Sequence, residues 1–187
     1  MHTSAAPAKA RYAQARNRAR VLLALTRRRP PVDIQALIER AGVAIVERVL
    51  PNGVRGTIGD VAGRRAILLN QQWRFSSEHE KRWVLAEELG HVLLGHRLVE
   101  STAPGAPQLG LVEECRITYE REARAFAAEL LMPLVEVRSR WFAAVNGRFG
   151  PSREASTDDM VRGLAQDFGV TPGAMRIRLQ ELRLVKR

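Results

Sequence analysis

Several residue types are scarce in this chain of 187 residues, and each scarcity excludes something. A single cysteine, Cys115, excludes an internal disulfide. Aromatic residues make up 5%, so a core must be built mainly from leucine, valine, isoleucine and alanine. No apolar run reaches the roughly 18 residues that span a bilayer. The short apolar run at residues 21–25 precedes its positive charges, which is the reverse of a signal peptide. We therefore expect a cytoplasmic protein with no membrane contact.

Acidic residues are missing from the N-terminal segment, in which none precedes Asp33, whereas eight lysines and arginines do. The chain as a whole carries a net charge of +10, and its C-terminal tail is basic again. Basic ends around a more acidic middle favour contact with a nucleic acid or with an acidic protein partner. The alternative is that an arginine-rich composition carries no information about partners. The candidate contact residues are Arg27, Arg28, Arg29, Arg176 and Arg178.

Periodicity along the chain predicts an α+β fold with a small antiparallel sheet. A helix is predicted over Ala8–Thr26, before Pro30-Pro31, and a second one begins after Asp33 and ends at Gly42. Three β-rich runs follow within residues 43–70, divided by the turn signals at 51–53 and 62–63. Because the runs are short and consecutive, a meander is the simplest way to pair them.

The second half of the chain is predicted to be helical. One helix follows Ser76-Ser77, and another runs from about Ile117 to Met132. Two more are predicted around Gly169, where Thr171 is a suitable cap for the last helix. This pair partly follows the helix-turn-helix pattern, although Arg178 stands where an apolar residue is usual. We expect a basic N-terminal helix or arm at 1–30, an α+β core at 31–145 and a C-terminal helical, helix-turn-helix-like segment at 146–187.

The stretch "VLAEELGHVLLGH", residues 84–96, has the rhythm of the zinc-peptidase motif His-Glu-x-x-His, but its first position holds Glu87. Residues four apart on a helix share a face, so Glu87 and His91 point the same way, and Glu88 lies about 100° further round. In such a motif the first and fifth residues bind the metal, while the second activates a water as general base. A third protein ligand must come from elsewhere. His96 is expected to have a capping or core role.

Glu120 is the candidate for the third ligand, at the start of the stretch "EREARAFAAELLMP". Helical angles place Glu120 inside an apolar stripe, whereas Glu122 and Glu129 fall on the opposite side, which should be solvated. A carboxylate on a buried stripe is costly unless it is paired or bound to a metal. The stripe consists of Ala123, Phe126, Ala127, Leu130 and Leu131.

The two stretches in this order resemble the ImmA/IrrE family of metallopeptidases, and the resemblance extends over roughly residues 21–184. It implies an α+β fold with a gluzincin-like zinc site in which Glu87, His91 and Glu120 stand at the ligand positions and Glu88 at the general base. It also implies a partner, because the best-understood members cleave a helix-turn-helix repressor and others occur beside toxin–antitoxin modules. We therefore expect a cognate repressor or antitoxin.

Two departures from the family pattern bear on this expectation. One is Glu87 in place of histidine, and the other is Arg124 where the family usually has asparagine. Arg124 lies one turn after Glu120, so its guanidinium could take the place of the metal and hold Glu87 and Glu120 together. If a metal is bound instead, the two carboxylates shift the preference from zinc toward Mn²⁺ or Mg²⁺.

Three functions remain open from the sequence. The first is a regulator that holds its partner without cleaving it, with no metal bound. The second is an active metal-dependent endopeptidase that cleaves the repressor. The third is a DNA-binding regulator that uses the basic ends of the chain.

Overall fold

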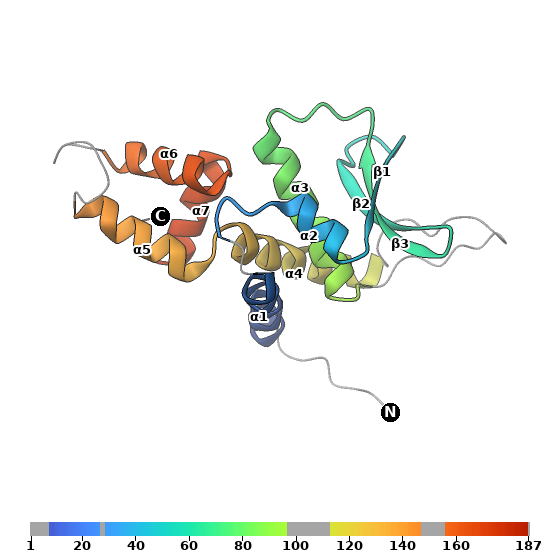
Figure 1. Ribbon diagram of the computed structural model, residues 1–187, viewed down its shortest axis with the longest axis horizontal. Helices are drawn as coiled ribbons and strands as arrows, with labels where there is room; N and C mark the ends of the chain where they lie inside the picture. The colour runs from blue at the N-terminus through green and yellow to red at the C-terminus, as the bar shows by residue number, and fades with distance from the viewer. Residues whose placement is uncertain (1–7, 27–28, 97–112, 147–155, 187) are drawn as a thin grey trace.

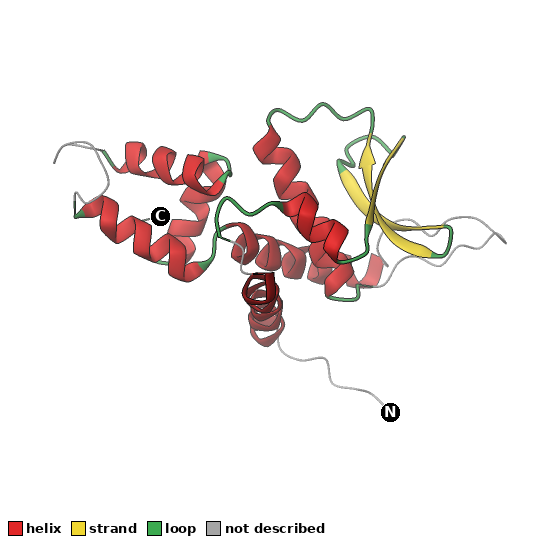
Figure 2. Cartoon of the chain, in the orientation of Figure 1, coloured by secondary structure: helices red, strands yellow, loops and turns green. Residues whose placement is uncertain are grey.

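The computed structural model describes residues 8–26, 29–96, 113–146 and 156–186. Figure 1 shows the three strands at one end of the molecule, α5, α6 and α7 at the other, and α4 between them. Helices predominate over strands (Figure 2), and the predicted α+β class is confirmed. None of the described helices is long and apolar enough to cross a membrane. The elements are α1 (Ala8–Thr26), α2 (Ile34–Arg40), β1 (Ala44–Arg48), β2 (Gly56–Val61), β3 (Arg64–Asn70), α3 (Glu78–Leu93), α4 (Glu113–Leu131), α5 (Leu134–Val145), α6 (Thr157–Phe168) and α7 (Pro172–Glu181).

The sheet is mixed, so the prediction of a purely antiparallel sheet was wrong. Its strand order is β1-β3-β2, with β2 antiparallel and β1 parallel to β3. The reason lies in β3, whose residues 66–70 are all buried. A strand that is buried on both faces takes the central position, where both of its edges are paired. The first and second strands are therefore separated by the third.

Local capping signals position the helices as the sequence predicted. The Asp33 carboxylate accepts the Ala36 N–H at 3.0 Å at the start of α2, and the Ser77 hydroxyl accepts the Glu80 N–H at 3.2 Å at the start of α3. Gly169 ends α6 with a φ of 62°, in the left-handed region that glycine adopts without strain. The helix α5 was not predicted; it begins directly after Pro133.

Helix α1 packs along α4, and Ala15 and Ala19 of α1 are completely buried. This contact contradicts the expectation that Glu122 and Glu129 are solvated, because they are 6% and 1% exposed. Each is neutralised by an arginine from α1: Arg11 pairs with Glu122, and the Nε of Arg20 donates to Glu129 at 2.8 Å.

The sequence proposed Arg178 as a contact residue for a partner or nucleic acid. This proposal needs correction, because the Arg178 side chain is buried. Arg178 is 1% exposed, its Nε donates to the Met132 carbonyl at 3.1 Å, and its guanidinium pairs with Glu129. The arginine at the apolar position of the predicted helix pair therefore ties α7 to the end of α4. It is not available to contact a partner or DNA.

Close approach of α3 and α4 depends on Gly90. A Cβ at this position would lie 3.0 Å from Cδ1 of Phe126 and 3.3 Å from Cα of Ala123. Because the second contact is with backbone, the two helices would have to separate. The absent side chain therefore fixes how closely the two helices of the candidate site approach.

We expect Gly90→Ala to lower the free energy of unfolding by about 1–2 kcal/mol, because overpacking outweighs the better helix propensity of alanine. The matched control is Gly163→Ala on α6, where a Cβ would meet no atom within 4 Å. That change should raise the free energy of unfolding by about 0.5–1 kcal/mol. Urea unfolding of the two variants measures both values, and a stabilising Gly90→Ala would contradict the packing described above.

Candidate functional site

Helices α3 and α4 bring the residues of the two sequence motifs together. The Nε2 of His91 lies 4.0 Å from a carboxylate oxygen of Glu120. Glu87, Glu88 and His91 are buried, with 9%, 9% and 2% exposure. The Glu120 side chain is 38% exposed, so it lies at the edge of the site and not within the buried stripe that the helical angles predicted.

Arg124 lies between the two carboxylates that the sequence proposes as metal ligands. Its Nε is 3.5 Å from Oε1 of Glu87, and its Nη2 is 3.9 Å from Oε2 of Glu120. Glu87 also accepts a hydrogen bond from Trp83, one turn earlier on α3. Sequence reasoning missed Trp83, although its spacing of four residues from Glu87 was a signal that could have revealed it.

His91 is oriented by a second histidine that reaches it from the end of α3. The Nδ1 atoms of His91 and His96 are 2.8 Å apart, and Nε2 of His96 lies 3.0 Å from Glu122. A carboxylate only accepts hydrogen bonds, so His96 donates from Nε2 and accepts at Nδ1 from His91. His91 therefore presents the lone pair of its Nε2 to the site. The ring of Tyr119 stacks on His96 at 4.2 Å, and His96 is 2% exposed, in agreement with the core role expected of it.

The site favours uncharged forms of its acids and bases. Burial, with smaller contributions from the charges of Glu87 and Glu120, raises the pKa of Glu88 to about 8. Burial also raises the pKa of Glu87, although Trp83 and Arg124 oppose this. Burial and the neighbouring His96 lower the pKa of His91 to about 3. At neutral pH His91 is therefore neutral, and Glu88 is mostly protonated.

As arranged, these side chains do not fit a metal ion. Within the part of the chain that the structure describes, no group of three or more histidine, cysteine, aspartate and glutamate side chains is arranged to hold one. Glu87 is engaged by Trp83 and Arg124, and Glu120 faces the same guanidinium. The Nε2 of His91 is a donor of the kind that zinc takes, but one histidine is not a site.

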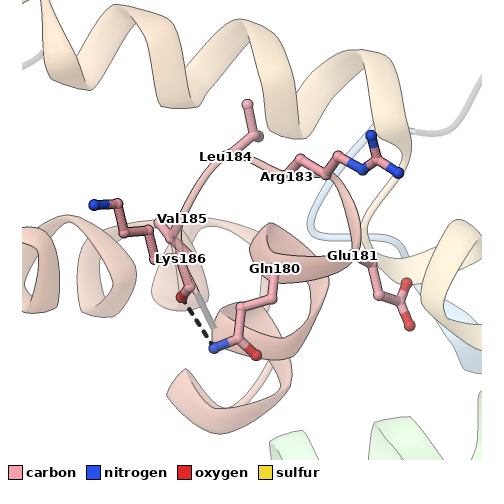
Figure 3. Close-up of a pocket in the computed structure, with 6 residues that line it drawn as sticks. All are labelled: Gln180, Glu181, Arg183, Leu184, Val185 and Lys186. Carbon is pink, nitrogen blue, oxygen red and sulfur yellow. Dashed lines mark hydrogen bonds between the residues drawn. The ribbon is translucent and has the colours of Figure 1, made fainter.

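A cleft of about 790 Å³ adjoins the site. Glu87 and Arg124 lie in its wall, and it continues along α4 toward α7. A second hollow lies at the end of α7, where the Gln180 side chain donates to the Lys186 carbonyl at 3.3 Å (Figure 3); it is lined by Gln180, Glu181, Arg183, Leu184, Val185 and Lys186. No residue that the sequence proposes for chemistry lines this second hollow, so the cleft beside Glu87 is the candidate functional surface.

A family model described as the IrrE N-terminal-like domain of peptidases matches residues 38–180, which is most of the chain. This chain belongs to the ImmA/IrrE family. The match includes both motif helices and all of α7 except its last residue, so the ImmA/IrrE resemblance of the sequence is confirmed. A comparison with curated proteins gives no match.

The basic residues that the sequence proposed as contacts lie in different settings in this ImmA/IrrE protein. Arg27 and Arg28 are outside the described residues, while Arg29 is exposed. Arg176 forms an ion pair with Asp158 of α6. Of the three that the structure describes, Arg29 is exposed, Arg176 is paired and Arg178 is buried, so Arg176 and Arg178 do not form a shared basic surface.

Proposed function

We propose that this ImmA/IrrE protein controls a cognate helix-turn-helix repressor or antitoxin by binding it, without metal-dependent hydrolysis. The observation that carries this proposal is the position of Arg124 between Glu87 and Glu120. Its guanidinium supplies permanent positive charge to both carboxylates. The two departures from the family pattern then compensate each other, because the added carboxylate meets the added cation.

In this proposal the cleft beside Glu87 receives part of the partner protein. Glu88 stands at the position of the general base, and as long as no metal ion is bound beside it, burial raises its pKa to about 8, so that it is mostly protonated at neutral pH. The proposed partner class is the one that the family resemblance implies. The geometry supports binding because it leaves an open cleft next to a site whose carboxylates are already engaged.

One observation favours the alternative of an active endopeptidase. His91 presents its Nε2 lone pair to the site and is held by His96, as a zinc-binding histidine is held by a hydrogen-bond partner. If a metal displaced Arg124, the Nε2 of His91 would already be oriented to bind it. DNA binding has no comparable support, because Arg178 is buried and Arg176 is paired with Asp158.

Titration of the native protein with zinc in a calorimeter tests the proposal. We expect binding no tighter than a Kd of about 10 µM, because ligand binding must first break the contacts between Arg124 and the two carboxylates. Zinc binding that is nanomolar, stoichiometric and abolished by His91→Ala would overturn the proposal and favour the endopeptidase.

A further inference from the structure

The cleft has a charge imbalance that its own side chains do not correct. Five arginines and three glutamates line it, and one of those arginines, Arg178, is paired with Glu129 behind the cleft and with Glu181 on its own helix. Arg121 is exposed and forms no hydrogen bond or ion pair with the residues that the structure describes. Arg16 reaches Glu181 only at 3.6 Å, and its buried Nε has no acceptor among the described residues.

The floor of the same cleft is apolar and built from small residues. Ala125 and Ala128 follow Arg121 along one face of α4 at spacings of four and three, and Met132 comes directly after the end of the helix. Ala174 and Ile177 face them from α7, and Ile177 is 60% exposed. Alanines on both sides leave room for a large apolar side chain, and the exposed isoleucine would bury its surface against it.

We propose that this cleft binds an acidic peptide segment of the partner protein, with a large apolar side chain between α4 and α7 and carboxylates on Arg121 and Arg16. This inference rests on the proposed function, in which a partner occupies the cleft, and it adds the chemistry of the segment that is recognised. Charge complementarity selects the acidic segment, because Arg121 and Arg16 are the guanidiniums that the cleft leaves least satisfied.

Fluorescence anisotropy with the full chain tests the proposal. The probe is a fluorescein-labelled peptide of about twelve residues in which leucines are spaced four apart among glutamates. Two matched peptides replace the leucines by serine or the glutamates by lysine. We expect saturable binding of the acidic apolar probe and at least about tenfold weaker binding of both matched peptides. No saturable binding of the probe up to about millimolar protein, or equal binding of the serine peptide, would overturn the proposal.

Matched variants locate the site. Arg121→Glu should weaken binding of the probe at least about tenfold, whereas Arg138→Glu, with the same charge change on an exposed face of α5, should change it less than about twofold. Ile177→Ser should weaken binding about fivefold or more, and its control is Val135→Ser, at another exposed apolar residue, which does not line the cleft. Equal losses in the test and control variants would show diffuse charge attraction and overturn the proposal.

Two further outcomes separate this inference from others. Displacement of the probe by duplex DNA at low concentration would assign the cleft to a polyanion and overturn the peptide proposal. Tight zinc binding by a protein that still binds the probe through Arg121 would overturn the non-hydrolytic function and leave the peptide cleft standing. Weak zinc binding together with no probe binding would overturn the peptide proposal and leave the non-hydrolytic function standing.

Discussion

Replacing Glu87 by histidine and Arg124 by asparagine in one protein is expected to raise zinc affinity by about a thousandfold or more, equivalent to about 4 kcal/mol. The double variant returns both positions to the family pattern. Asparagine removes a cation that lies 3.5 Å and 3.9 Å from the two carboxylates, and histidine supplies a second nitrogen ligand on the face of His91. Zinc would then meet two histidines and Glu120, and His91 is already turned correctly by His96.

Each single change should raise the zinc affinity less than the double change, because each leaves one residue of the compensating pair in place. Glu87→His alone leaves the guanidinium beside Glu120, and Arg124→Asn alone leaves two carboxylates, which favour harder ions. Calorimetry on the four proteins gives the coupling energy between the two positions. Arg121→Asn, one turn earlier on α4, is the charge-matched control and should leave zinc affinity unchanged. If the double variant gains nothing over the native protein, the pairing of Glu87 with Arg124 is not what prevents metal binding.

Replacing Glu88 by glutamine is expected to stabilise the protein at pH 8 by a large amount, on the order of 4 kcal/mol. Burial raises the pKa of Glu88 to about 8 from an ordinary value of 4.5. A carboxyl with a raised pKa contributes its stability fully below pH 4.5 and loses it as the pH rises through 8. Glutamine has a similar shape and does not ionise, so it escapes this loss.

Urea unfolding between pH 5 and pH 8 measures the effect. The stability difference between Glu88→Gln and the native protein should grow by about 1.4 kcal/mol for each pH unit in this window. Glu80 provides a control of opposite sign, because hydrogen bonds from Ser76 lower its pKa and its charged form is the favoured one. Glu80→Gln should therefore destabilise by a nearly constant amount between pH 5 and pH 8, and this effect should be lost only below pH 4.5. A pH-independent difference for Glu88→Gln would mean that Glu88 is charged in the folded protein.

The sequence predicted helix boundaries well wherever a local signal determined them. Asp33, Ser77 and Thr171 each cap a backbone N–H three residues away, and such a contact needs no knowledge of the rest of the fold. Proline and glycine likewise mark ends through their own backbone preferences. The convergence of Glu87, His91 and Glu120 could also be predicted, because helical phasing and the order of the two motifs indicate it.

The failures concern residues whose setting depends on a distant segment. Helical angles on α4 correctly separated Glu120 from Glu122 and Glu129 but assigned the wrong side to solvent. An angle states which residues share a face, not which element covers that face. The covering element is α1, more than a hundred residues away, and its arginines make the burial of Glu122 and Glu129 tolerable. The sequence predicted a capping or core role for His96 but did not identify its partner, because Glu122 had been assigned to the surface.

By itself, the sequence determined the family, the α+β class, the helix caps and the unusual pair of Glu87 and Arg124, since these follow from residue identity and short-range spacing. The tertiary structure decided the central position of β3, the burial of Arg178 against Glu129 and the open cleft between α4 and α7. Each of these depends on which long-range surfaces meet, and that is set by the summed burial of many apolar side chains. A local sequence pattern does not determine which of these long-range surfaces pack together.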